Sequence, residues 1–160
     1  MRRMIRLTAV ATAVLLTGCV DLVGLIDGRP DSYVERDGLS YQVIVDESPY
    51  DYDVFEYRIR ITNTSHRTIE RSLPVRLGTP RVYRDERWSH PVWNACDWGC
   101  EYYGDRVRIR LRAGEAVEGW WGEVWAGDFA RYRGTYHLVL LIDTGRHRFE
   151  VLGLPELHVW

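Results

Sequence analysis

Residues 106–112 read Arg-Val-Arg-Ile-Arg-Leu-Arg, and this stretch decides the fold class. Branched apolar side chains alternate strictly with arginines. Successive side chains of a β-strand point to opposite faces, so Val107, Ile109 and Leu111 would face a core and the arginines would face solvent. A helix would spread both kinds of side chain around its whole circumference. The stretch therefore predicts a strand with one buried face.

The same alternation recurs along the chain, separated by turn residues, and no segment has a sustained helical period. Residues 134–142 are almost all apolar, as is typical of a central strand buried on both faces. Seven or eight short strands at this spacing predict an all-β fold, an immunoglobulin-like antiparallel β-sandwich. The expected strands cover 40–46, 55–61, 68–77 (a strand pair or bulged strand, with Pro74 at an edge), 81–88, 106–112, 115–124, 134–142 and 146–152.

The segment Gly134-Thr135-Tyr136 opens the long apolar strand. This arrangement resembles the tyrosine corner of immunoglobulin-like sandwiches. We expect Tyr136 to bind backbone upstream of the strand.

Length and composition place the chain among ordinary globular domains. Its 160 residues are 46% hydrophobic and 28% charged, which suits one domain and excludes a disordered chain. The formal net charge is −2, so there is no general electrostatic case for nucleic-acid binding.

The N-terminus predicts export. Arg2, Arg3 and Arg6 precede an apolar stretch at 7–16, which is too short to span a bilayer of roughly 30 Å. Then follows Leu16-Thr17-Gly18-Cys19, which resembles the bacterial lipobox. An ordinary secretory signal with a chance cysteine is the alternative.

The lipobox resemblance implies cleavage before Cys19 and lipidation of that residue, and several acyl chains anchor a protein stably. Val20 follows the cysteine instead of an aspartate, so an inner-membrane retention signal is missing. The resemblance implies a location on the periplasmic face of the outer membrane. We expect a signal peptide at 1–18, a lipidated tether at 19–38 and the domain at 39–160.

Cys96 and Cys100 are the two remaining cysteines, and an even pair in an exported chain predicts a disulfide. A metal held by this pair would need two more ligands, so we expect no metal site and no cofactor.

The order of motifs resembles the bacterial intracellular proteinase inhibitor (BsuPI-type) family and its exported relatives. The resemblance covers about residues 39–142, implies the immunoglobulin-like fold, and carries protease inhibition as an alternative function. Its motifs are Ile61-Thr62-Asn63-Thr64-Ser65, Val82-Tyr83-Arg84-Asp85, the segment Trp88 to Trp93, Leu111-Arg112-Ala113-Gly114-Glu115, Trp120-Trp121 and Gly134-Thr135-Tyr136.

Aromatic residues gather around the cysteine pair: Trp88, Trp93, Trp98, Tyr102 and Tyr103. Exposed Trp and Tyr on a stiff loop are typical of sites that stack on sugar rings or anchor a protein partner. Packing into the core under a long loop is the alternative. The neighbours Trp120 and Trp121 should face opposite sides of their strand.

The arginines 106, 108, 110 and 112 form a second candidate site. Four guanidinium groups on one strand face repel each other unless something neutralises them. One interpretation is an anionic envelope ligand held by Arg106, Arg108, Arg110 and Arg112. The other is neutralisation by carboxylates of adjacent strands, with Glu115, Glu118 and Glu123 as the candidates.

The sequence favours binding over catalysis. Ser89 and His90 are adjacent, so an extended segment would point them apart, and no Gly-x-Ser-x-Gly motif occurs. The acidic segment 46–53 suggests calcium or, alternatively, a solvated turn. We expect no catalysis, a membrane contact through the anchor, and an envelope protein or glycan as partner.

Overall fold

The computed structural model describes residues 29–47, 54–84, 88, 90–95 and 104–159. These residues form an all-β, sandwich-like fold, as the alternation predicts. The described helix α2 (Ala126–Phe129) is four residues long, and no described helix has the length and apolar character to cross a bilayer. The strands are β1 (Val34–Arg36), β2 (Leu39–Glu47), β3 (Val54–Asn63), β4 (Ile69–Pro74), β5 (Gly78–Arg84), β6 (Trp93–Asn94), β7 (Arg106–Leu111), β8 (Ala116–Trp125), β9 (Gly134–Asp143), β10 (Arg148–Leu154) and β11 (Leu157–Val159).

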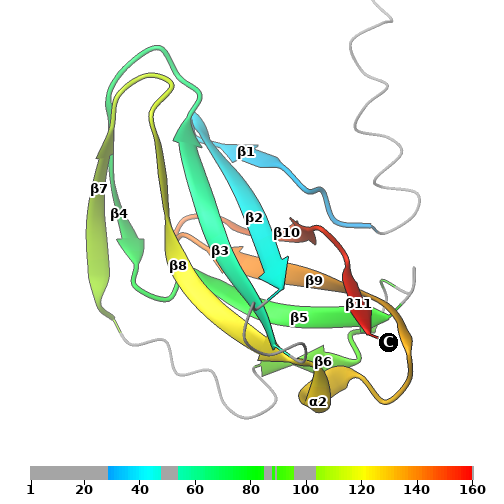
Figure 1. Ribbon diagram of the computed structural model, residues 1–160. Helices are drawn as coiled ribbons and strands as arrows, with labels where there is room; N and C mark the ends of the chain where they lie inside the picture. Colours follow the sequence, from blue (N-terminus) through cyan, green and yellow to red (C-terminus); the bar gives the residue numbers. More distant parts are fainter. Residues whose placement is uncertain (1–28, 48–53, 85–87, 89, 96–103, 160) are drawn as a thin grey trace, which may run out of the picture.

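A nine-stranded sheet curls into two layers, and β4 and β7 form a separate two-stranded sheet beside it (Figure 1). The strand order is β6-β5-β9-β10-β2-β3-β8, with β1 paired to β2 and β11 paired to β9. The layers join where β10 pairs in parallel with β2. Gly153 permits this approach, since a Cβ there would lie 2.7 Å from the Val45 side chain. The strand pairs are antiparallel, as predicted, except at this junction.

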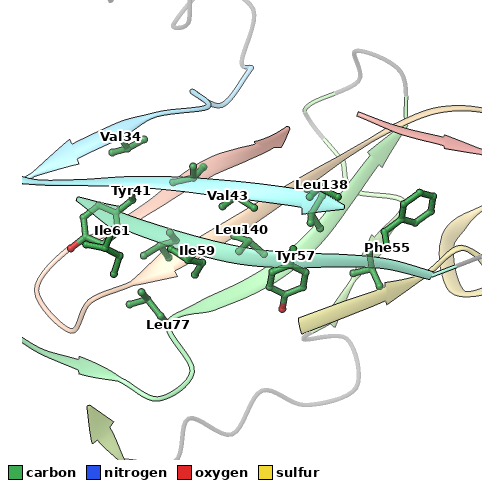
Figure 2. Packing of buried hydrophobic residues seen from close by; sticks show 14 of the residues in the cluster. Val34, Tyr41, Val43, Phe55, Tyr57, Ile59, Ile61, Leu77, Leu138 and Leu140 are labelled. Atoms are coloured by element: carbon green, nitrogen blue, oxygen red, sulfur yellow. The ribbon is translucent and has the colours of Figure 1, made fainter. Parts of the chain in front are cut away.

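The core lies between the layers, where β3 and β9 supply fully buried side chains such as Ile59, Leu138 and Leu140 (Figure 2). The opposite face of β9 is also covered, because Val139 packs with Tyr83, Leu152 and Trp88. Strand β9 is thus central and buried on both faces, which confirms the prediction from its apolar run.

Tyr136 forms the predicted tyrosine corner. Its side chain is 1% exposed, and its Oη donates a hydrogen bond of 2.6 Å to the carbonyl oxygen of Tyr132. The Phe129 ring packs against Tyr136 edge-on, at 5.1 Å between centroids. The corner therefore fastens the start of β9 to the segment after α2.

The eight predicted strands are all present, and β1, β6 and β11 are additional. Each of these has only two or three residues, too few for an alternating pattern to be visible. Strand β1 lies within the predicted tether at 19–38, so the end of that segment belongs to the sheet. The strand predicted to reach Trp88 ends at Arg84, and Trp88 lies in a turn.

Candidate functional site

A cleft of about 380 Å³ lies between the two ends of the curled sheet. The strand order ends at β6 on one side and β8 on the other, and these strands are not paired with each other. The connection from β4 to β5 closes one wall. The aromatic residues that line the cleft are Tyr57, Trp93, Trp120 and Trp121.

A β-bulge on β8 shapes this cleft. Tyr57 lies opposite Gly122 and Ile59 opposite Gly119, so two tryptophans, Trp120 and Trp121, oppose the single residue Arg58. Bulges increase the local twist and redirect side chains, often beside functional sites.

Trp120 has a φ of 54°, which is a strained value for a bulky residue. Its indole is half-buried against the core, and Nε1–H donates a hydrogen bond of 3.0 Å to the carbonyl oxygen of Pro74. Trp121 is 63% exposed. The two indoles therefore face opposite sides, which confirms the prediction for this pair.

An ionic network holds the exposed indole in place. The Arg58 guanidinium lies 5.3 Å from the Trp121 ring centroid and forms ion pairs with Asp46 and with Glu118, the latter at 2.9 Å. Hydrogen bonding to Asp46 in the first place, and to Glu118, raises the pKa of Arg58. Both carboxylates hold the Arg58 guanidinium in place, and the guanidinium in turn makes a cation–π contact with the Trp121 ring.

Tyr57 lies beneath the bulge. Its ring occupies the space over Gly122, where a Cβ would lie only 2.8 Å from Tyr57 Cε1. Burial raises the pKa of Tyr57 to about 12, so the phenol stays protonated at neutral pH. No hydrogen bond to its Oη is found among the described residues. The Tyr57 hydroxyl can therefore form a hydrogen bond with a ligand.

The rim of the cleft carries two charged residues, Arg76 and Glu123. Glu123 is the one carboxylate among the described lining residues, and Glu56 lies opposite it on β3, beside Trp121. The described part of the chain contains no group of three or more His, Cys, Asp or Glu side chains that could hold a metal ion. Of the acidic segment considered for calcium, Asp46 pairs with Arg58, and 48–53 lies outside the described residues.

The structure divides the predicted aromatic cluster. Trp93 lines the cleft, whereas Trp88 stacks on Tyr83 at 5.6 Å and on His137 at 4.8 Å, against the other face of the β5–β9 layer. Trp88 and Trp93 therefore pack against different hydrophobic clusters and do not share one site, and the alternative of packing on the core holds for Trp88. Several candidates lie outside the described residues, and their roles stay predictions: Cys19, Cys96, Trp98, Cys100, Tyr102 and Tyr103.

The arginines of β7 alternate as predicted and are exposed, but their neutralising partner is different. Strand β7 pairs with β4, so Glu70 lies opposite Arg110, at 3.5 Å. Glu118 instead binds Arg58 and Arg60 on β3. The expectation of carboxylates from β8 is therefore wrong.

Glu115 and the apolar side chains of β7 are the remaining predictions for this region. Glu115 accepts a hydrogen bond of 2.7 Å from the Arg112 backbone N–H, so it caps the turn and not an arginine side chain. Ile109 and Leu111 are buried as expected. Val107 is 40% exposed, contrary to the prediction, and its pair with Leu73 is the last but one of the two-stranded sheet.

Sequence reasoning did not assign Tyr57, Arg58 or the Trp120–Trp121 pair to a site. A signal was available in Trp120-Trp121-Gly122, because a glycine inside a strand pattern indicates a bulge or a close approach.

Fold and cleft together define a class: an all-β sandwich-like domain with an aromatic cleft at the open seam of its sheet. Neither a protein-family model nor a curated protein matches the chain. The resemblance to proteinase inhibitors therefore depends on the sequence motifs alone.

Proposed function

We propose that this chain is a lipid-anchored cell-envelope protein that binds a saccharide, without catalysis, in the aromatic cleft. The observation that carries the proposal is the exposed Trp121 indole, fixed by Arg58 and adjoining the open seam.

The chemistry of the lining suits a sugar. A pyranose ring presents an apolar face of C–H groups that stacks on indole, and a rim of hydroxyls that needs hydrogen-bonding partners. The cleft offers Trp121 for stacking, and it offers Glu123, Arg76 and the Tyr57 hydroxyl for the rim. Its volume of about 380 Å³ is that of a small-ligand site.

Rigidity favours binding. An exposed side chain normally loses rotamer freedom when a ligand orders it, and this loss weakens affinity. The Arg58 network already orders Trp121, and the Pro74 carbonyl already orders Trp120. The site is therefore organised before a ligand arrives.

The lining supports binding more than cleavage. Glycoside hydrolysis generally needs two carboxylates on either side of the scissile bond. Within the described lining of the cleft, Glu123 is the one carboxylate, and Glu56, its partner across the strand pair, lines only the small pocket beside Trp121.

The location follows from the lipobox resemblance at Cys19. We expect the wild-type chain in the membrane fraction and the Cys19→Ser chain in the soluble fraction. Mass spectrometry should find acyl groups on Cys19 of the wild type. An unmodified wild-type chain that stays in the soluble fraction would overturn this part of the proposal.

The binding test uses the Cys19→Ser chain, which lacks the proposed anchor, and insoluble peptidoglycan as the first glycan. Co-sedimentation measures binding, and titration with soluble peptidoglycan fragments gives the affinity. Trp121→Ala should weaken binding by about tenfold or more, as removal of a central aromatic anchor does.

Trp125→Ala is the matched control, since Trp125 lies on the same strand, is 49% exposed and does not line the cleft. It should bind within about twofold of the parent, because contacts away from the site contribute little. Equal losses in both variants would contradict the proposal, as would capture of a peptide and no saccharide at the cleft.

A further inference from the structure

A second pocket lies away from the aromatic cleft and is basic. It has a volume of about 310 Å³, between the end of β1, strand β4 and the turn from β9 to β10. Arginines reach it from four elements: Arg36 from β1, Arg71 from β4, Arg106 from β7 and Arg146 from the turn. His147 also lines it.

The carboxylates of this pocket are already engaged. Asp37 contacts His147 Nε2 at 3.2 Å, and Glu70 pairs with Arg110, which lies outside the pocket. In the described part of the chain, none of the four pocket arginines forms an ion pair with a carboxylate. Four arginines thus line the pocket against two carboxylates and pair with neither of them, in a chain whose net charge is −2.

These guanidinium groups are positioned and retain donors. Arg71 and Arg36 each donate one hydrogen bond, to the carbonyl oxygens of Glu70 and Glu35, at 3.0 and 2.8 Å. Arg106 donates to Ser72 through Nε and Nη2. A guanidinium has five N–H donors, so each of the three keeps others for a ligand.

The turn that carries Arg146 is fixed. The Gly145 N–H donates to Asp143 Oδ1 at 2.8 Å, and the His147 N–H donates to Thr144 Oγ1 at 3.0 Å.

Tyr41 supplies an independent observation. Its side chain is 3% exposed and lines the pocket, yet its Oη has no hydrogen-bond partner among the described residues. Burial raises the pKa of Tyr41 to about 12, with Arg71 lowering it and Asp37 raising it less strongly. The phenol is therefore a neutral O–H donor close to both residues. This Oη is not one of the fully buried atoms that lack a partner, so it is open to the pocket and can donate a hydrogen bond to a ligand there.

We infer that this pocket binds a phosphate group. A phosphate carries up to two negative charges on tetrahedrally arranged oxygens, so it can accept hydrogen bonds from arginines on several sides. A planar carboxylate would satisfy fewer of the four arginines. The pocket volume is at the lower end for ligand sites of about 300–1,000 Å³, which suits a phosphate with a small group attached.

The site does not depend on the saccharide proposal, because the two pockets share no lining residue. It also differs from the predicted arginine row of β7. Only Arg106 of that row lines the pocket, whereas Arg36, Arg71 and Arg146 were not candidates from the sequence.

The test uses the full Cys19→Ser chain and two phosphate sources. Inorganic phosphate is titrated by calorimetry at constant ionic strength, with chloride as the balancing anion. Flotation with phosphatidylcholine vesicles, with and without phosphatidic acid, tests a lipid headgroup. Binding to either source supports the inference, and the arm that binds identifies the source.

The variants separate a built site from general charge. Arg71→Gln with Arg146→Gln should weaken binding by about tenfold or more, because hydrogen bonds from charged donors are lost. Arg108→Gln with Arg112→Gln removes the same charge from β7 and from the residue after it, outside the pocket, and should change binding by less than about twofold. Tyr41→Phe keeps the packing and should weaken binding by about threefold to tenfold.

Two outcomes would overturn the inference. One is no binding of either phosphate source to a folded parent chain. The other is the same loss in both arginine pairs, which would indicate charge attraction without a site. If Arg71→Gln fails to fold, the single variant Arg146→Gln, altered at an exposed turn, replaces the pair: unchanged phosphate binding in that variant would overturn the inference.

Discussion

Strands β8 and β9 both have ten residues, but they have different roles in the molecule. Strand β9 is buried on both faces, pairs with β5 and β10 in unbroken register, and begins at the Tyr136 corner. Strand β8 lies at one end of the curled sheet, contains a bulge and exposes Trp121 and Trp125.

This difference between the two strands indicates which part of the sheet can contain a binding site. A central strand gives up stability if it is distorted, because every residue packs on both sides. A terminal strand has a free edge and a partly solvated face, so it can hold a bulge and an exposed indole at lower cost. Changes in β9 should therefore act on stability, and changes at the β8 bulge should act on ligand binding.

The largest expected effect comes from the core face of β9. Leu140→Ala removes a fully buried side chain and should lower the free energy of unfolding by about 3 kcal/mol. Urea denaturation measures it. Leu154→Ala, at a side chain that is 44% exposed, is the control and should cost less than about 1 kcal/mol. A small loss for Leu140→Ala would mean that β9 is not the central strand.

The next effect tests the bulge itself. Gly122→Ala places a methyl group against the Tyr57 ring and should destabilise the chain by about 2 kcal/mol, through strain or displacement of the ring. Gly119→Ala lies on the same strand with open space at its Cβ and should cost less than about 0.5 kcal/mol. Equal unfolding midpoints for the two variants would remove the argument that Tyr57 lies tightly beneath the bulge.

A pH effect of about 2 kcal/mol involves the same tyrosine. Tyr41 and Tyr57 have pKa values of about 12 in the folded chain, against 10.0 for a free phenol, and burial also raises the pKa of Tyr83. A raised folded pKa contributes full stability below the unfolded value and loses it as the pH rises through the folded value.

We therefore expect the free energy of unfolding to fall between pH 10 and pH 12, in a chain that has no lysine to titrate there. Denaturation in urea at pH 9, 10 and 11 measures this slope. Tyr57→Phe should make the slope shallower. An unchanged slope in that variant would mean that the Tyr57 phenol is not buried.

The smallest effect concerns the corner. Tyr136→Phe keeps the ring and removes the hydrogen bond to the Tyr132 carbonyl, at an expected cost of about 1 kcal/mol. Thermal or urea unfolding measures this cost. Tyr132→Phe alters an exposed ring, leaves the backbone acceptor in place and should be nearly neutral. A neutral Tyr136→Phe would show that the corner does not fasten β9.

Much of the fold could be predicted from the sequence, because long strands with one buried face impose alternation. The eight longer strands, the all-β class and the Tyr136 corner follow from such patterns. The short strands β1, β6 and β11 could not be predicted, since two or three residues show no period. The parallel pairing of β10 with β2 depends on layer closure, which no local pattern records.

The site was predicted less completely, for a physical reason. Alternation gives the face of each residue but not the neighbouring strand. The partner of Arg110 therefore depends on β7 pairing with β4, and the cleft depends on β6 and β8 facing each other across the seam. Trp120 and Trp121 were assigned to opposite faces correctly, yet the bulge that makes them a site is a property of register.

The most direct test of the account follows the indole N–H signals of the seven tryptophans by NMR during titration with soluble peptidoglycan fragments. The account predicts that the indoles of Trp93, Trp120 and Trp121 shift together, while those of Trp88 and Trp125 stay in place. Shifts confined to Trp88 or Trp125, or no shift in any indole, would contradict a saccharide site at the seam of the sheet.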